Sequence, residues 1–238
     1  MRLYVDSFLE LIYTEKNTCF ICESYDESIG DKYICRHCEK LLKKLDAPLC
    51  SKCSKPINYG SSASLCPECS GEERYFEMSK SLYSYEGLIK NAIYSYKYYN
   101  HPYFYKMFGN MLLTYMLAEN YTNFDCIVPV PLHSSKMRTR GYNQSELLAR
   151  HLSKKLSIPY VDALKRIKKT AKQSEQSKLE RAKNLKDAFV IKNDAEIVVN
   201  SSVLLVDDIY TTGATVDECS KALKNRGAAN VFVITIAR

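Results

Sequence analysis

No stretch of this chain is apolar for long enough to cross a bilayer, which takes roughly 20 residues. The first residues also lack the features of a cleaved secretion signal, because Asp6 and Glu10 interrupt the apolar part and no small-residue cleavage site follows. A strong charge is lacking too: the net charge of +7 is too modest to establish a nucleic-acid partner, although it favours anionic ligands. We therefore expect a protein without a membrane span that works in the cytoplasm.

The composition shows no signature of disorder, since 46% of the residues are hydrophobic and 26% are charged. A chain of 238 residues fits one α/β domain with a small appendage. Eight of the ten cysteines precede residue 70, and the polar stretch "SGEER" then gives way to "SKSLYSYE". This asymmetry predicts a small domain over residues 1–75 and a larger one over 76–238, with a boundary near residues 71 to 78.

The early cysteines form four pairs, each with a gap of two residues, which lets both thiolates of a pair approach one ion. Eight thiolates predict two structural zinc ions, each closed by four sulfurs. The pairs could share zinc in sequence or alternately, and their nearly uniform spacing does not choose. His37 lies inside the second pair and is expected to be a bystander. The predicted ligands are Cys19, Cys22, Cys35, Cys38, Cys50, Cys53, Cys66 and Cys69.

Disulfides and a redox site are the alternatives to zinc. Disulfides rarely persist in a reducing compartment, and a redox motif needs one such pair near a βαβ unit instead of four in succession. The spacing therefore favours metal. The other two cysteines, Cys126 and Cys219, lie in apolar patterns without nearby ligand partners and are expected in the core.

The larger domain begins with a predicted strand near residues 81–85, a helix over 88–98 and a second helix reaching about residue 120. Tyrosines crowd the break between the helices, beside Lys90, Lys97 and Lys106. Aromatic rings beside cations are one way in which single-stranded nucleic acid is held. We favour the alternative that these rings pack the helices onto the sheet and the zinc domain. The tyrosines are Tyr94, Tyr96, Tyr98, Tyr99, Tyr103 and Tyr105.

Two segments carry positive charge. The apolar run "DCIVPVP" is typical of a buried parallel strand, and the loop after it, with Lys136, Arg138 and Arg140, would lie where open α/β sheets bind anions. A helix over 145–156 should follow. Residues 165–185 are highly charged, so they are expected to form either a mobile flap over an anionic ligand or a surface helix.

The stretch "VLLVDDIYTTGATV", Val203 to Val216, carries the clearest chemistry. A buried strand ends at two adjacent carboxylates, which need cations or hydroxyl donors as partners. Threonine hydroxyls, free N–H groups and Gly213 then precede a predicted helix, an arrangement that can hold a phosphate. Acids next to a phosphate cradle indicate a phosphorylated sugar, whereas simple helix capping explains only half of the pattern.

This stretch resembles the phosphoribosyl pyrophosphate (PRPP) motif of type I phosphoribosyltransferases. Together with the cysteine pairs, "YEGLIKNAIYSYKY", "VPVPLHSSKMRTRGYNQ" and "QSEQSKLERAKNLKDAF", it is similar to the ComF (ComFC) family of competence proteins over nearly the whole chain. The resemblance implies an α/β phosphoribosyltransferase fold, a parallel sheet flanked by helices, with an N-terminal double zinc ribbon. It also implies a role in DNA uptake during natural transformation.

The resemblance assigns Asp207 and Asp208 to the ribose hydroxyls and the turn after them to the 5′-phosphate. Arg138 and Arg140 are expected to contact pyrophosphate or DNA, and residues 167–187 match the flexible catalytic loop, with Gln173, Arg181 and Asn184 at the family's pattern positions. Tyr210 stands at a variable position. The expected catalytic residues are Asp207, Asp208 and Arg181, and the expected PRPP contacts are Asp207, Asp208, Thr211, Thr212, Gly213, Ala214, Thr215, Lys97, Arg138 and Arg140.

The residues predict a protein that binds PRPP or another phosphorylated sugar. The resemblance further implies that Mg²⁺ accompanies PRPP and that the protein handles imported single-stranded DNA and meets other competence or DNA-processing proteins. A metabolic phosphoribosyltransferase with an unidentified acceptor is one alternative. A nucleic-acid-binding module that keeps the fold without catalysis is the other.

Overall fold

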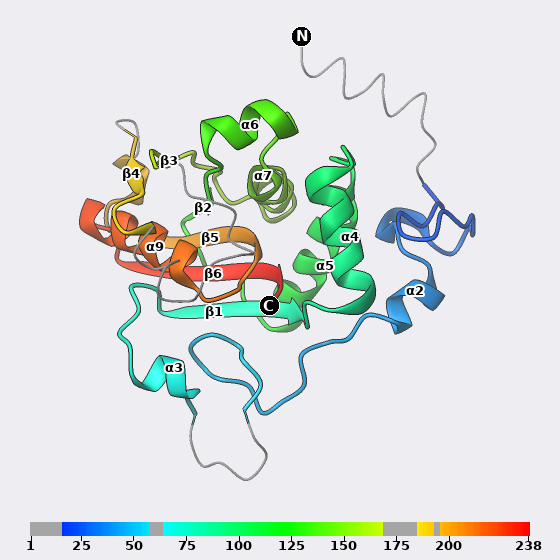
Figure 1. The fold of residues 1–238 in the computed structure, drawn as a ribbon, viewed down its shortest axis with the longest axis horizontal. Coiled ribbons are helices and arrows are strands. Elements are labelled where there is room, and N and C mark those ends of the chain that lie inside the picture. Colours follow the sequence, from blue (N-terminus) through cyan, green and yellow to red (C-terminus); the bar gives the residue numbers. More distant parts are fainter. Residues whose placement is uncertain (1–15, 58–63, 169–184, 193–195) are drawn as a thin grey trace.

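The computed structural model describes residues 16–57, 64–168, 185–192 and 196–238. Its centre is a four-stranded parallel sheet in the order β1–β6–β5–β2 (Figure 1). The strands are β1 Met78–Tyr83, β2 Cys126–Pro129, β5 Ser202–Ile209 and β6 Asn230–Ala237. The two strands with the longest pairing, β5 and β6, are apolar runs buried on both faces, as expected for the interior of a parallel sheet.

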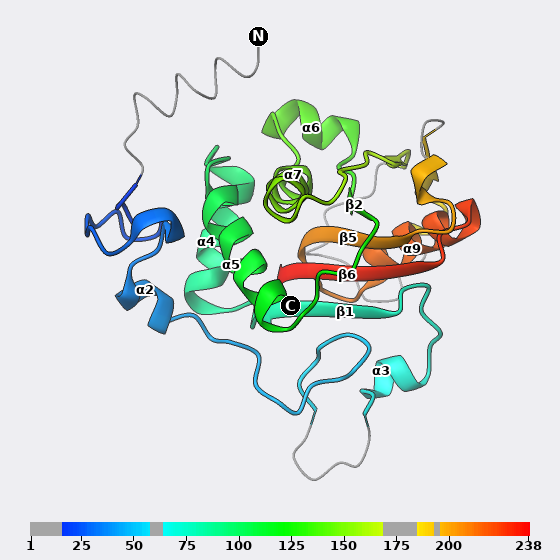
Figure 2. The same cartoon turned by 180° about the vertical axis from the view of Figure 1, so that it is seen from behind.

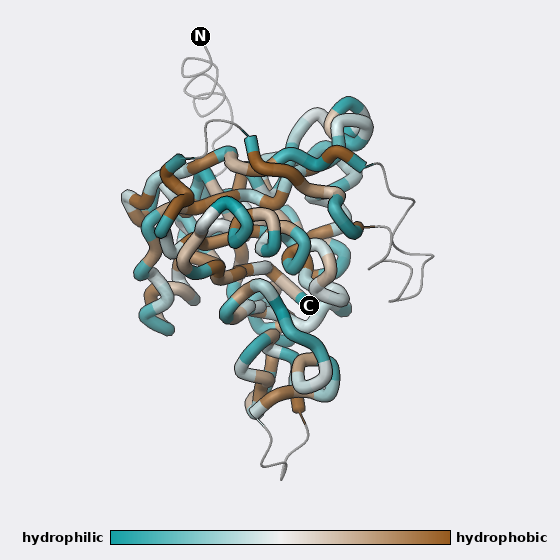
Figure 3. Tube along the Cα trace, turned by 90° about the vertical axis from the view of Figure 1, so that its left-hand side faces the viewer, coloured by the Kyte–Doolittle hydropathy of each residue, from teal (hydrophilic) through white to brown (hydrophobic). Residues whose placement is uncertain are grey.

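Alternating residues of β5 divide the core into two layers. Leu204 and Val206 pack in the cluster that holds the helices α4 Gly87–Tyr98, α5 Phe104–Ala118 and α7 Gln144–Leu156. Val203 and Leu205 pack in the opposite cluster with α9 Ala214–Arg226. Because successive strand residues point to opposite faces, one apolar strand serves both layers. Figures 1 and 2 show the sheet between these helices, and Figure 3 shows hydrophobic segments concentrated at the centre.

Most of the remaining elements of the larger part lie near the carboxyl ends of β2 and β5. The short helix α6 Ser134–Arg140 follows β2, and the antiparallel pair β3 Leu164–Arg166 and β4 Phe189–Ile191 lies beside α9. A 3₁₀ turn, η3 Glu196–Val198, precedes β5. The structure thus differs from the expected basic loop, since residues 134–140 form a helix that Gly141 ends at φ +81°.

The N-terminal part holds three short elements: η1 Gly30–Lys32, α2 Arg36–Lys40 and α3 Pro67–Ser70. The region of η1 and α2 lies beside α4 and α5, whereas α3 lies on the far side of β1, in a lobe that projects from the sheet (Figures 1 and 3). Phe20 stacks on Phe104 of α5, with ring centroids 5.7 Å apart. The cysteine-rich part therefore packs against the larger part at two separate places.

Several expectations about single elements are confirmed. The strand at residues 81–85 starts earlier, at Met78, and the helices at 88–98 and 145–156 match α4 and α7 within one residue. Cys126 and Cys219 are fully buried in the core. Within the described ranges, no helix combines the length and the apolar character that a bilayer crossing needs.

Candidate functional site

The eight early cysteines form two groups, in sequence order. In each group the four sulfur atoms lie within 4.8 Å of one another, so the first two pairs share one centre and the last two pairs share the other. Of the two pairings that the sequence left open, the structure has the sequential one. The groups are Cys19, Cys22, Cys35 and Cys38, and Cys50, Cys53, Cys66 and Cys69.

The sulfur geometry fits zinc. A zinc–sulfur distance of about 2.3 Å places tetrahedral sulfurs about 3.8 Å apart. The Cys22 and Cys35 sulfurs are 3.7 Å apart, and so are those of Cys53 and Cys66. Both groups are therefore preformed four-sulfur sites, which is the donor set of structural zinc. His37 is exposed and belongs to neither group.

Arg238 connects the second cysteine group to the loop after β5. Its guanidinium donates hydrogen bonds to the carbonyl oxygen of Cys53 and to the Cys53 sulfur, the latter at 3.1 Å. The same group lies 5.0 Å from the ring centroid of Tyr210, which is almost fully buried. Tyr210 thus packs between the cysteine group and the loop that contains Gly213.

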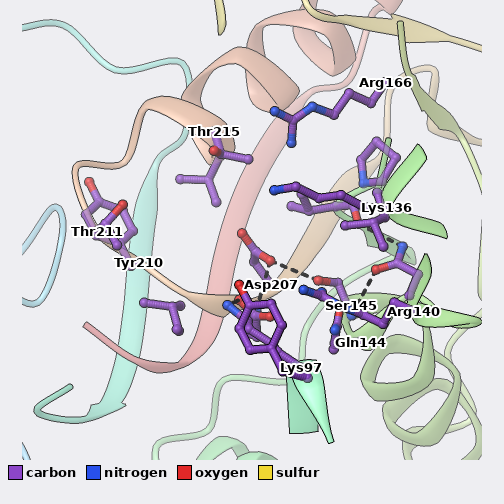
Figure 4. Close-up of a pocket in the computed structure, with 18 of the residues that line it drawn as sticks. Lys97, Lys136, Arg140, Gln144, Ser145, Arg166, Asp207, Tyr210, Thr211 and Thr215 are labelled. Atoms are coloured by element: carbon purple, nitrogen blue, oxygen red, sulfur yellow. Dashed lines mark hydrogen bonds and ion pairs between the residues drawn. The ribbon is translucent and has the colours of Figure 1, made fainter. Parts of the chain in front are cut away.

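A cavity of about 770 Å³ opens at the carboxyl ends of β2 and β5, between α4, α6, α7 and the start of α9. Two acids, four cations and the loop after β5 all line it. This edge of an open parallel sheet is where α/β folds bind ligands. Figure 4 shows Lys97, Lys136, Arg140 and Arg166 around Asp207, with Thr211 and Thr215 opposite them.

Asp207 and Asp208 end the buried part of β5, and each has a partner. The Ser145 hydroxyl donates to Asp207 Oδ1 at 2.8 Å, and Lys97 Nζ lies 2.9 Å from Asp208 Oδ1. Burial and the neighbouring Asp208 raise the pKa of Asp207 to about 7. Burial alone would lower the pKa of Lys97, but the two carboxylates outweigh it and raise that pKa.

The other cations crowd one wall of the cavity. Burial lowers the pKa of Lys136, and the positive charges of Arg166, Arg140 and Lys97 lower it further. Burial also lowers the pKa of Arg166, whose side chain is almost fully enclosed. With four cations against two acids, the cavity carries a net positive charge that an anionic ligand relieves.

The loop Tyr210–Gly213 leads directly into α9. Gly213 is the N-cap of α9 and adopts φ +83°, a left-handed conformation that favours glycine. Any Cβ at this position would overlap the Tyr210 hydroxyl. The N–H groups at the first turn of a 13-residue helix, next to threonine hydroxyls, can bind a phosphate.

The structure brings together most of the residues that the sequence predicted. The cavity is lined by Lys97, Arg140, Asp207, Asp208, Thr211, Gly213 and Thr215. Arg138 is exposed on α6 and does not line it, and Thr212 and Ala214 stand next to the lining residues. Gln173, Arg181 and Asn184 lie outside the described residues.

Sequence reasoning missed Ser145, Gln144 and Arg166, which come from α7 and β3. Gln144 is buried, and its side-chain nitrogen has no hydrogen-bond partner in the described part of the chain. A buried donor without a partner is costly, so a ligand in this cavity would find it available. The one sequence signal for a ligand contact at Ser145 and Gln144 is their position just after the basic segment with Lys136, Arg138 and Arg140.

Sequence comparisons agree with this geometry. A phosphoribosyl transferase domain matches residues 143–238, and a double zinc ribbon domain matches residues 8–70. Fold and site together define a type I phosphoribosyltransferase fold joined to a double zinc ribbon.

Several relatives match most of the chain, and three of them represent the group. Competence protein F of Haemophilus influenzae is 30% identical over 88% of this chain and 92% of its own length. Competence protein ComFC of Bacillus subtilis is 25% identical, over 94% and 95%. The DNA utilization protein YhgH of Escherichia coli (strain K12) is 29% identical, over 94% and 98%. The chain belongs to the ComF (ComFC) family of competence proteins.

Proposed function

We propose that this chain binds PRPP with Mg²⁺ in the cavity at the end of β5, and that it acts in the cytoplasm on DNA taken up during natural transformation. The observation that carries the first part is the meeting of two acids, the glycine-containing turn before α9 and four cations in one cavity. The second part is supported by the names of the relatives, a competence protein in two cases and a DNA utilization protein in the third.

Each group of PRPP has a matching part of the cavity in this proposal. Asp207 and Asp208 accept hydrogen bonds from the ribose hydroxyls. The turn 211–215 and the first N–H groups of α9 bind the 5′-phosphate. Lys97, Arg140 and the neighbouring cations face the pyrophosphate. Arg138, exposed on α6, remains available for DNA.

We propose that the chain divides into two domains, residues 1–75 and 76–238, and that the cysteine groups stabilise the first of them. Their zinc ions would supply folding energy to a region whose described helices have five residues or fewer. The second group also supports the site through Arg238 and Tyr210.

If ribose phosphate is transferred, the bond between C1 and the pyrophosphate breaks through an oxocarbenium-like state. Bound to PRPP, Mg²⁺ would neutralise charge on the leaving group. Lys136, Arg140 and Arg166 would stabilise the negative charge that develops on the departing oxygen. Asp207 and Asp208 would hold the ribose so that its C1 faces the acceptor, and Arg181 is proposed as a further catalytic group.

Calorimetric titration of PRPP and Mg²⁺ into the zinc-loaded protein tests the binding. The variant with both Asp207→Ala and Asp208→Ala should lose measurable binding, while its zinc content stays at two ions per chain. Asp46→Ala, which removes an exposed carboxylate distant from the cavity in sequence, should bind as the unaltered chain does. Retained affinity in the double variant would refute the assignment of the cavity.

Catalysis needs its own measurement. Pyrophosphate release from PRPP is measured with nucleobases, with amines and with an oligonucleotide as candidate acceptors. Release that depends on one acceptor identifies a phosphoribosyltransferase of that acceptor class. PRPP binding without release under every condition identifies a protein that uses PRPP as a ligand alone.

A further inference from the structure

Three tyrosines on the last turns of α4 and just beyond it stand apart from the other aromatic residues of that region. Tyr94, Tyr98 and Tyr99 are 48%, 60% and 63% exposed, whereas Tyr96 is fully buried. The sequence favoured packing as the task of all these rings. That interpretation holds for Tyr96, Tyr103 and Tyr105, which pack in or against the core, and fails for the exposed three.

The three exposed rings form one aromatic surface. The ring centroids of Tyr94 and Tyr98 are 4.7 Å apart, and those of Tyr94 and Tyr99 are 5.6 Å apart. Residues 94 and 98 are one helical turn apart, so their side chains leave α4 on the same side. Tyr96 points to the opposite side and packs against Phe108. Exposed aromatic surfaces of this kind are typical of binding sites.

This surface borders the cavity already described. Tyr94 and Tyr98 line the cavity together with Asn100, and the guanidinium of Arg140 lies 5.1 Å from the centroid of the Tyr98 ring. The same cavity extends to Thr211 and Gly213. A ligand on the tyrosines and a phosphorylated sugar at the turn would therefore occupy two ends of one space.

The charges around the tyrosines fit a polyanion. Lys90 on α4 and Arg138 on α6 are exposed, and Arg140 reaches the aromatic surface itself. Cations beside exposed aromatic rings hold the phosphates and the bases of a single strand at the same time. A duplex hides its base faces in its own stack, so only unpaired bases can use such rings.

We propose that Tyr94, Tyr98 and Tyr99, with Arg140, form a stacking platform for the bases of single-stranded nucleic acid at the mouth of the cavity. The platform deepens the proposed function and rests on it, because it names the surface through which DNA would reach the PRPP site. Lys97 lies next to Tyr98 in sequence and pairs with Asp208. The platform and the sugar site thus share one segment of α4, so occupation of either site should change affinity at the other.

Fluorescence anisotropy with a labelled oligothymidylate tests the platform on the full zinc-loaded chain. The variant with Tyr94→Ala and Tyr98→Ala should bind at least about tenfold more weakly, since each lost base–ring stack accounts for roughly that factor. The matched variant with Tyr94→Phe and Tyr98→Phe keeps the rings and should bind as the unaltered chain does. Tyr25→Ala, which removes a tyrosine that is 68% exposed near the first cysteine group, should have no effect.

Two further readouts separate stacking from charge attraction. An oligonucleotide of the same length without bases should bind the unaltered chain at least as weakly as the alanine variant, which keeps Tyr99, binds oligothymidylate. In a salt series, the alanine variant should keep the slope of log affinity against log salt, whereas Arg138→Gln should reduce its size by about 0.7 if it removes one phosphate contact.

Equal binding of oligothymidylate by the alanine variant and the unaltered chain would overturn the platform, and so would equal binding of the base-free strand. PRPP titration of the unaltered chain and of the same alanine variant distinguishes a failure of the platform from a failure of the proposed function. Normal PRPP affinity together with unchanged DNA binding refutes the platform alone. Absence of PRPP binding in the unaltered chain refutes the function of the cavity.

Discussion

Replacing Asp207 with asparagine should make the protein more stable, and increasingly so as the pH rises. Burial and Asp208 raise the pKa of the Asp207 carboxyl from 3.8 to about 7 in the folded chain. Between these values the folded state keeps a proton that the unfolded state has lost, so the free energy of unfolding falls as the pH rises through this window. Asparagine keeps the oxygen that accepts from Ser145 and never ionises.

The size of the effect follows from the two pKa values. A difference of about 3 units corresponds to roughly 4 kcal/mol of destabilisation once the carboxyl is ionised in both states. Between pH 5.5 and 8.5, a range that avoids strong acid near the zinc sites, about 2 kcal/mol of this change should appear. The contribution of the zinc sites is common to both proteins and cancels in the difference between them.

Urea denaturation of the unaltered chain and of Asp207→Asn, at pH 5.5, 7.0 and 8.5, measures this difference. The stability advantage of the variant should grow by about 2 kcal/mol over the range. Asp46→Asn, at an exposed position, should follow the pH profile of the unaltered chain. If the stability of Asp207→Asn and that of the unaltered chain change with pH in parallel, the pKa of Asp207 is not raised in the folded chain and the reasoning is refuted.

Two further substitutions test the surroundings of the turn 211–215, which we propose as the phosphate site. Gly213→Ala should weaken PRPP binding at least about tenfold and destabilise the chain by about 2 kcal/mol, because the new Cβ meets the Tyr210 hydroxyl and the backbone stays left-handed. Calorimetry measures the affinity and urea denaturation measures the stability. An unchanged affinity would contradict the proposed phosphate site at this turn. Arg238→Ala should leave two zinc ions per chain but speed zinc transfer from the second cysteine group to a chromogenic chelator. The reason is that the Cys53 sulfur loses a hydrogen bond from a cation. Transfer at the original rate would show that this contact does not shield the site.

Local sequence patterns predicted much of this structure. The apolar run before Asp207 predicted β5, and the periodic segment after Gly213 predicted α9. The two-residue cysteine spacing predicted the two four-sulfur groups. Each signal is contained in a short window, because strand, helix and knuckle geometry are local. The division at residues 75 and 76 and the roles of the site residues remain predictions.

The features that the sequence did not predict depend mainly on contacts between residues far apart in the chain. Tyr210 seemed uninformative, yet it lies between Arg238 and Gly213, and no local pattern marks that contact. The sharing of zinc between neighbouring pairs depends on how the knuckles pack, which nearly uniform spacing leaves open. The helix α6 was expected as a loop because Met137 is the one apolar residue among its seven.

The contact between Arg238 and Cys53 also implies an order of events as the chain is made. The sulfurs that meet between neighbouring pairs are 13 residues apart, so each four-sulfur group can assemble early and locally. Cys53 meets Arg238 across 185 residues, and β6 must be in place first. Contacts between such distant positions form late in folding. The second four-sulfur group can therefore assemble before its contact with Arg238 forms, and the closing of β6 against the sheet then adds that contact.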